Sequence, residues 1–373
     1  MSDVKYWLGF NLVKGIGPAK LEALLAYFGD IGTAWQANEY QLKKIGLDGR
    51  SIHSFLKTRQ EVDLDRCLEQ VQAAGITLLT WDTPAYPTYL REIPNPPPVL
   101  YVQGEILPSD QWAVAVVGTR RLTTYGRQMT QDLVRGLVHN NVTVVSGLAR
   151  GIDAIAHQTA IEVGGRTLAV LGSGLDCVYP AENRKLIPPL LAGQGAVISE
   201  YALGTQPEAK NFPPRNRVIS GLSLGVIVVE AGQRSGALIT ADFALEQNRE
   251  VMAVPGNATS PASRGPNRLI QEGAKLITSV EDVLEELNLL MVAEHTAVQL
   301  ALPETAEEAA LLSALSRQPV HIDALCRATG LPSSQVSSTL TMMELKGMVQ
   351  QVGGMNYALT REPEPVYEVE SKK

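Results

Sequence analysis

Short apolar runs alternate with amphipathic stretches along the middle of the chain, from Ala113 onward. The runs predict buried strands at about 113–117, 142–145, 167–171, 196–199, 225–229, 250–254 and 275–277. Helical spacing of apolar residues predicts helices at about 124–139, 152–163, 183–191, 214–222, 237–247, 265–272 and 279–288. Strands that alternate with helices are typical of an α/β fold, here a Rossmann-like, doubly wound and mostly parallel sheet.

Residues 1–60 have a different pattern and predict a small helical domain of the SAM or helix-hairpin-helix type. Gly15-Ile16-Gly17-Pro18 is a tight turn between apolar segments, and Pro18 suits a first helical position. In a helix-hairpin-helix motif, the amides of such a turn bind phosphate. The alternative is a plain connection whose glycines only permit the turn, and both interpretations remain open.

Residues 61–112 lead from this domain into the sheet. The pattern predicts a helix that ends at Gly75 and a strand at Ile76–Thr80. A second strand runs to Gly104 after three consecutive prolines, which exclude a helix there. We therefore expect one extended Rossmann-like domain over 61–288.

A separate small domain is predicted over 304–360, after a linker at 289–303 and before a disordered tail at 361–373. Three helices and a glycine-tipped hairpin in this order predict a winged helix. Its third helix contains no arginine, so its electrostatic attraction for DNA is weak. We interpret the domain as an accessory module for protein contacts.

Composition excludes several classes of protein. The net charge of −7 argues against a protein that coats duplex DNA by bulk charge, although it does not exclude a local basic groove. No apolar run reaches 18 residues and the first residues lack the pattern of a signal peptide, so we expect a cytoplasmic protein without a membrane span. Three distant cysteines fit reduced thiols.

The loops that follow the predicted strands suggest a binding face. Five strand ends carry glycine, small hydroxyl residues or arginine, in the loops that begin near Gly118, Ser146, Gly172, Glu230 and Pro255. Because ligands of such sheets bind at the carboxyl ends of the strands, we expect a shared phosphate-binding face there. Neither a G-x-G-x-x-G fingerprint in the first unit nor a P-loop motif is present, and no cofactor is expected.

The stretch 211–241 combines such a loop with an aromatic residue and two arginines. Phe212 lies next to Arg215 and Arg217, just before a predicted strand, loop and helix. Helix N-termini attract anions, while aromatic rings stack on bases. A ligand that has both phosphates and bases is therefore indicated.

The candidates for catalysis are weak. His157 is a possible base, but a lone histidine on a helix is more often a hydrogen-bonded structural residue. Asp153 lies early in the same helix, where it can cap it. Asp176 and Glu230 lack metal-ligand spacing, so we expect local hydrogen bonds, no metal site and no enzyme activity.

Several motifs in this sequence resemble the DNA processing protein A family, also called DprA or Smf. They are Val116-Val-Gly-Thr-Arg120, Ser146-Gly-Leu-Ala-Arg-Gly-Ile-Asp153, Ala169-Val-Leu-Gly-Ser-Gly-Leu-Asp176, Ser199-Glu-Tyr201, Phe212-Pro-Pro-Arg-Asn-Arg217 and Arg234-Ser-Gly-Ala-Leu-Ile-Thr240. The resemblance implies a protein that binds and protects single-stranded DNA during natural transformation and loads the RecA recombinase onto it. It also implies a homodimer.

The resemblance further implies roles for residues. Arg120 would hold a phosphate, Phe212 would stack on a base, Arg215 and Arg217 would line a basic pocket, and loop residues would offer hydrogen-bond donors. The expected DNA-binding residues are Gly118, Thr119, Arg120, Ser146, Gly147, Arg150, Gly172, Gly174, Lys210, Phe212, Arg215, Asn216, Arg217, Ser235 and Gly236. Many members have a basic residue directly after Tyr179-Pro180, where this chain has Ala181.

Two alternatives compete with this interpretation. A nucleotide-binding enzyme of the lysine-decarboxylase-like, or phosphoribohydrolase, group would share the fold. Such an enzyme is expected to carry Pro-Gly-Gly-x-Gly-Thr where this chain has Glu230-Ala-Gly-Gln-Arg-Ser-Gly236. A transcription regulator that uses the winged helix would need more cations than that domain carries.

Overall fold

The computed structural model describes residues 3–289, 305–315, 320–345, 349–351 and 354–359. The chain divides into two compact units, 1–288 and 289–373. The predicted linker (apart from Leu289) and the predicted tail lie outside the described residues. The finer division into 1–60 and 61–288 stays a prediction.

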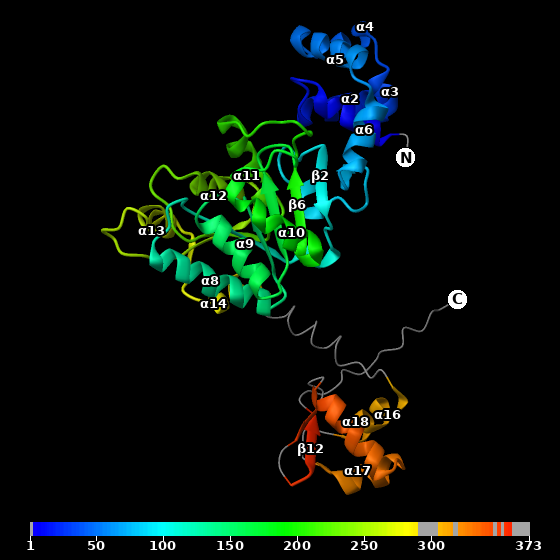
Figure 1. The fold of residues 1–373 in the computed structure, drawn as a ribbon, viewed down its shortest axis with the longest axis vertical. Helices are drawn as coiled ribbons and strands as arrows, with labels where there is room; N and C mark the ends of the chain where they lie inside the picture. The colour runs from blue at the N-terminus through cyan, green and yellow to red at the C-terminus, as the bar shows by residue number, and fades with distance from the viewer. Residues whose placement is uncertain (1–2, 290–304, 316–319, 346–348, 352–353, 360–373) are drawn as a thin grey trace. The chain divides into compact units, whose positions relative to one another are not determined.

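The first unit begins with helices, as predicted (Figure 1). They are α1 (Val4–Leu12), α2 (Pro18–Phe28), α3 (Ile31–Trp35), α4 (Glu39–Lys44), α5 (Gly49–Glu61) and α6 (Leu64–Ala73). An aromatic cluster forms their core, in which the Phe10 ring lies 5.1 Å from that of Trp35 and 5.4 Å from that of Phe55. The Lys20 ammonium donates to the Gly15 carbonyl (2.8 Å) and to Asp48 (2.6 Å), so this partly exposed cation is already engaged by the protein at the turn.

The sheet of the first unit has nine strands among the described residues. They are β1 (Ile76–Thr80), β2 (Val99–Gly104), β3 (Ala113–Val117), β4 (Thr143–Ser146), β5 (Thr167–Leu171), β6 (Gly195–Ser199), β7 (Gly225–Val228), β8 (Glu250–Ala253) and β9 (Lys275–Leu276). The order is β1-β2-β6-β5-β4-β3-β7-β8-β9. Strands β3 to β9 pair in parallel, and β2 joins β6 in antiparallel fashion. The predicted mostly parallel sheet is confirmed.

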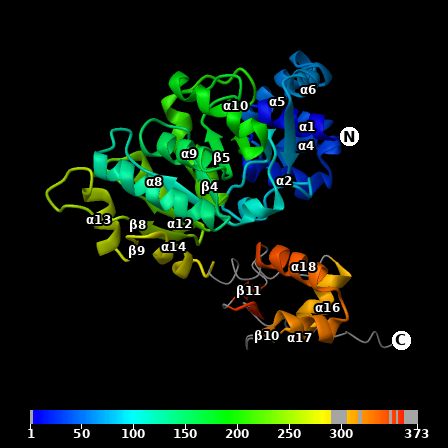
Figure 2. The ribbon, with the colours of Figure 1, turned by 60° about the horizontal axis from the view of Figure 1, so that its bottom comes forward.

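Helices cover both faces of the sheet. They are α7 (Thr88–Arg91), η1 (Pro108–Gln111), α8 (Thr124–His139), α9 (Ile152–Glu162), η4 (Ala209–Asn211), α11 (Phe212–Gly221), α12 (Gly236–Glu246), α13 (Arg264–Gln271) and α14 (Val280–Glu286). Helix α8 contacts α9 and α14, whereas α11 contacts α12 (Figures 1 and 2). The order of strands reverses between β3 and β7, because β4 to β6 extend the sheet in one direction and β7 to β9 in the other. Such a reversal is where ligands of doubly wound sheets bind.

One predicted helix is wrong in detail. Instead of a single helix at 183–191, the structure has a 3₁₀ turn η2 (Ala181–Leu186), a short α10 (Ile187–Pro189) and a wide turn η3 (Leu190–Gln194). Pro188 and Pro189 lack the N–H groups that a regular helix needs, and Gly193 adopts a positive φ of 108°.

The second unit contains α16 (Ala306–Ala314), β10 (Val320–His321), α17 (Ile322–Thr329), α18 (Ser333–Leu345), β11 (Val349–Gln351) and β12 (Asn356–Leu359). Strands β10, β12 and β11 form a small antiparallel sheet. Three helices and a hairpin in this order confirm the predicted winged helix. Its core contains Leu311, Leu325, Val336 and Leu340.

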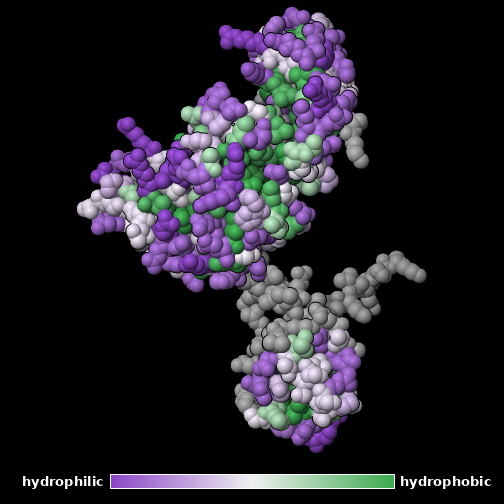
Figure 3. Space-filling model, viewed as in Figure 1, coloured by the Kyte–Doolittle hydropathy of each residue, from purple (hydrophilic) through white to green (hydrophobic). Residues whose placement is uncertain are grey.

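The visible surface of the first unit is mostly hydrophilic, with hydrophobic residues gathered in a band (Figure 3). No helix among the described residues is long and apolar enough to cross a bilayer.

Candidate functional site

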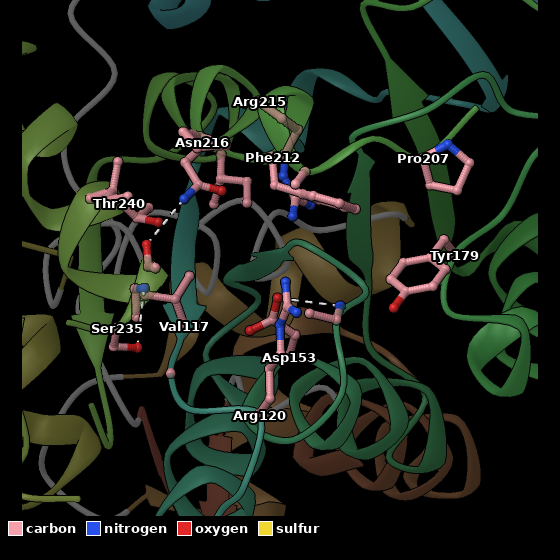
Figure 4. Close-up of a pocket in the computed structure, with 18 residues that line it drawn as sticks. Val117, Arg120, Asp153, Tyr179, Pro207, Phe212, Arg215, Asn216, Ser235 and Thr240 are labelled. Atoms are coloured by element: carbon pink, nitrogen blue, oxygen red, sulfur yellow. Dashed lines mark hydrogen bonds between the residues drawn. The ribbon is translucent and has the colours of Figure 1, made fainter. Parts of the chain in front are cut away.

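A cavity of about 630 Å³ opens at the carboxyl ends of the strands, where their order reverses. We call it the switch-point cavity (Figure 4). Its lining residues come from the loops after β3, β4, β5 and β7 and from the segment that leads into α11 and α12. They include Val117, Gly118, Arg120, Ala149, Asp153, Tyr179, Pro207, Phe212, Arg215, Asn216, Ser235, Gly236 and Thr240. The predicted convergence of the strand-end loops on one face is therefore present in the structure.

Phe212 occupies the centre of the cavity, at the first position of α11 (Figure 4). Its ring centroid lies 5.8 Å from the guanidinium carbon of Arg120, 5.9 Å from that of Arg215 and 6.0 Å from the ring of Tyr179. A Cβ at Gly172 would come within 2.9 Å of the Phe212 ring, so this glycine makes room for the aromatic side chain. An aromatic ring beside two guanidinium groups suits a base that is attached to phosphate.

Arg215 is a buried cation beside the Phe212 ring, with 4% of its surface exposed. Its Nη1 donates to the Gly147 carbonyl (2.7 Å) and to the Val170 carbonyl, at the ends of β4 and β5. Burial lowers the pKa of the guanidinium to about 10, while the nearby Asp153 carboxylate opposes that shift. Arg215 therefore remains charged at neutral pH and places a fixed positive charge on the wall of the cavity.

Asp153 organises the loop after β4. Its Oδ2 accepts hydrogen bonds from the amides of Gly147 (3.2 Å) and Ala149 (3.4 Å). Burial raises the pKa of this carboxyl, and the charge of Arg215 acts in the opposite direction. Asp153 lies in the first turn of α9, where its charge suits the helix dipole, but it does not cap this helix, because its carboxylate accepts from amides of the preceding loop.

The exposed cations near the cavity differ in their pairing. Arg150 forms a bidentate ion pair with Glu182, in which Nε contacts Oε1 and Nη2 lies 2.9 Å from Oε2. Lys210 pairs with Glu208 at 2.6 Å. Arg120 is exposed and makes no ion pair with any residue that the structure describes. Arg120 is therefore an exposed cation that lines the cavity and has no ion-pair partner among the described residues.

Ser235, Gly236 and Asn216 lie together on the side of the cavity formed by α12. The Ser235 hydroxyl oxygen accepts from the Ala237 amide (3.4 Å) and so caps α12. The Asn216 amide donates to the Gly236 carbonyl (3.1 Å), which leaves its own oxygen as an acceptor.

Three of the residues expected to offer donors to the ligand use those donors inside the protein instead. The Ser146 hydroxyl donates to the Val116 carbonyl (2.7 Å), and the amides of Gly147 and Gly174 donate to Asp153 and to the Thr205 carbonyl. We therefore correct the expectation that these groups offer donors to a ligand. The backbone of Thr119 is engaged, since its amide donates to the Glu230 carbonyl (2.7 Å) and its carbonyl accepts from Ile152, and its hydroxyl oxygen accepts from the Arg121 amide (3.2 Å).

Arg217 also departs from the expected place. It does not line the cavity, because two residues of helix rotate it by about 200° from Arg215. Its side chain is 13% exposed and forms an ion pair with Glu200, which is 14% exposed.

The weak candidates for catalysis have structural roles, as expected. His157 is buried with its Nδ1 2.7 Å from the Thr167 hydroxyl, and burial lowers the pKa of its imidazole to about 3. Glu230 accepts from the Thr123 amide (2.9 Å) and hydroxyl (2.5 Å). Asp176 accepts from the Gly204 amide (2.9 Å). Among the described residues, no group of three or more metal-ligating side chains is present.

Tyr179 is a site residue that was not expected from the sequence. Its ring lies beside that of Phe212, and it is 41% exposed at the mouth of the cavity. The sequence does contain a signal for it, because Tyr179 is an aromatic residue shortly after the loop Gly172-Ser173-Gly174, which follows β5.

Two sequence models of known families match the chain. DNA recombination-mediator protein A matches residues 77–288, and the DprA winged helix domain matches residues 295–355. Protein Smf from Synechocystis sp. is 36% identical over 393 residues, which cover 95% of this chain and 98% of that protein.

Two solved structures resemble the chain as well. DNA processing protein A from Streptococcus pneumoniae has a TM-score of 0.67 at 36% identity and covers 76% of this chain and 97% of its own. The second is DNA processing protein A from Helicobacter pylori, in a structure concerned with its single-stranded DNA binding mode. It has a TM-score of 0.51 at 31% identity, and the match covers 58% of this chain and 96% of that protein.

Proposed function

Since the chain belongs to the DNA recombination-mediator protein A family, we propose that it binds single-stranded DNA, without reading its sequence, in the switch-point cavity. The observation that carries this proposal is the Phe212 ring between Arg120, Arg215 and Tyr179. Every base has a face on which an aromatic ring can stack, and every nucleotide has a phosphate for Arg120. A duplex keeps its bases inside its own stack, so a single strand is favoured.

The likeness to the Helicobacter pylori protein, whose single-stranded DNA binding was studied, supports the same ligand. We extend the proposal to the wider role: the chain protects incoming single strands during natural transformation, loads RecA onto them, acts as a homodimer in the cytoplasm and catalyses no reaction. The rate of RecA assembly on a strand already coated with single-strand-binding protein tests the loading role. Light scattering in solution tests the dimer.

Strand binding is tested by fluorescence anisotropy with a labelled oligo-dT strand and a matched duplex, at two salt concentrations. We compare the natural chain with Arg120→Glu and with Arg135→Glu. Arg135 is an exposed arginine near the C-terminal end of α8, which precedes β4 and so lies toward the amino ends of the strands, away from the cavity; it is therefore the control. We expect Arg120→Glu to weaken strand binding at least tenfold and to reduce the salt slope by ~0.7 for each phosphate that the variant no longer neutralises.

Equal binding by the Arg120→Glu and Arg135→Glu variants, or no strand binding at all, would reject the cavity as the strand site. Nucleoside monophosphates would then be tested as ligands, with release of the free base as the sign of the enzyme alternative. The burial of Glu230 against Thr123 disfavours that alternative, because the carboxylate is held away from the cavity by two hydrogen bonds.

A further inference from the structure

Glu200 and Tyr201 connect the N-terminal helices to the helix that carries Phe212. They follow β6 directly, both bond to the segment 211–217, and Glu200 also bonds to α1. We call these two residues, together with Asn11 and Arg217, the α11 clasp. Nothing in its position suggests contact with a ligand, since none of the four lines the switch-point cavity.

The clasp holds α11 at two points. The Tyr201 hydroxyl donates to the Asn211 carbonyl (3.2 Å), one residue before Phe212. The Arg217 Nη2 donates to the Glu200 carboxylate on the far side of the same helix. The pair is mostly shielded from water, so its geometry is held more firmly than that of a surface ion pair.

The clasp is also anchored in α1. The Asn11 side-chain amide donates to the Glu200 carbonyl (3.2 Å), and its oxygen accepts from the Tyr101 hydroxyl on β2 (2.9 Å). The N-terminal helices lie beside the β2 end of the sheet (Figure 1). Asn11 therefore joins these helices to Glu200, which is adjacent to Tyr201, the residue that holds the start of α11.

From these contacts we propose that Glu200, Tyr201 and Asn11 are positioning residues for Phe212, and that the N-terminal helices set the strength of base stacking through them. The inference rests on the proposed strand binding. It assigns Arg217 to this clasp and not to the DNA. It also means that the N-terminal helices affect the affinity for DNA without contacting the DNA.

The test compares oligo-dT with an abasic strand of equal length, which has the phosphates but no bases to stack. The ratio of the two affinities reports the contribution of the bases alone. We use Tyr201→Phe and Asn11→Ala, which each remove hydrogen bonds without leaving a buried charge, and Glu200→Gln as a stronger variant. Asn38→Ala is the control, because it removes the cap of α4 and weakens the N-terminal helices away from the clasp.

Tyr201→Phe removes one hydrogen bond and Asn11→Ala removes two. We expect each variant to lower the affinity for oligo-dT by about two- to tenfold per hydrogen bond removed, and to leave the affinity for the abasic strand unchanged. Asn38→Ala should leave the ratio unchanged. In the Phe212→Ala background, Tyr201→Phe should have no further effect, because the ring it positions is gone.

Equal losses for both strands, a full additional loss in the Phe212→Ala background, or the same change in Asn38→Ala would overturn the positioning role. Failure of the natural chain to bind either strand would be a different result. It would reject the proposed function, and the positioning role with it. If Glu200→Gln does not fold, Tyr201→Phe and Asn11→Ala still decide the question.

Discussion

Replacing Phe212 by alanine removes the central ring of the switch-point cavity and leaves its charges in place. The cations Arg120 and Arg215 lie 5.8 and 5.9 Å from the ring centroid, and neither depends on the ring for a hydrogen bond. Arg215 remains tied to two backbone carbonyls. The substitution therefore separates base stacking from phosphate attraction.

The expected loss of affinity follows from the value of one stacked base. Stacking on an aromatic side chain contributes ~1–3 kcal/mol, which corresponds to about a 5- to 150-fold increase in Kd. The free energy of unfolding should fall by less than the ~3–5 kcal/mol that is typical of a fully buried phenylalanine, since Phe212 is only partly buried.

Anisotropy titrations with oligo-dT and thermal unfolding are measured side by side for Phe212→Ala, Phe212→Leu and Phe212→Trp. Leucine keeps apolar volume without a π face, so it should bind as weakly as alanine, whereas tryptophan should retain most of the affinity. A large loss of stability with unchanged affinity would show that Phe212 is a core residue. Full affinity in the leucine variant would refute stacking.

Three further outcomes follow from the structure. Glu182→Gln removes the carboxylate that pairs with Arg150, so Arg150 becomes free to bind phosphate. In titrations the variant should bind the strand a few-fold more tightly and with a steeper salt dependence. An unchanged salt slope would place Arg150 outside the path of the strand. Arg166→Ala should lower the free energy of urea unfolding by about 3 kcal/mol, the low end for breaking a buried pair, because it leaves the buried Asp110 carboxylate without its cation while Arg166 itself is partly exposed. Strand affinity should not change, since both residues precede strands and lie at their amino ends, away from the cavity. The neutral form of His157 is favoured by folding, so its contribution to stability is complete above pH ~6.5 and is lost as the pH falls toward its folded pKa of about 3. Between pH 6 and 5 the natural chain should lose up to ~1.4 kcal/mol per pH unit more than His157→Gln, and parallel pH curves would contradict the burial of this imidazole.

The order of strands and helices in the first unit could be predicted from the sequence, because a strand buried on both faces is a continuous apolar run. The run Val226-Ile-Val-Val229 is an example, flanked by glycine and Glu230. The antiparallel addition of β1 and β2 to the β6 edge could not be predicted in this way. Pairing with β6 depends on contacts between residues about a hundred positions apart, such as Tyr101 and Ser199.

The candidate site could be predicted as a face but not as a set of contacts. Arg215 and Arg217 look equivalent in the sequence, two residues apart and next to Phe212. Helical rotation and the position of Glu200 after β6 give them different surroundings. In the same way, the donors of Ser146 and Gly174 are used by Val116 and Thr205, which local sequence does not reveal.

The two prolines that follow Phe212 have a consequence for the entropy of binding. Pro213 and Pro214 form the start of α11 and fix two φ angles directly beside the ring. The backbone that carries Phe212 has little freedom left to lose, so the protein side of the complex is preorganised. The entropic cost of association then falls on the strand. Under the proposed binding, oligo-dA, whose bases must first leave their own stack, should therefore bind less tightly than oligo-dT even without any reading of the base.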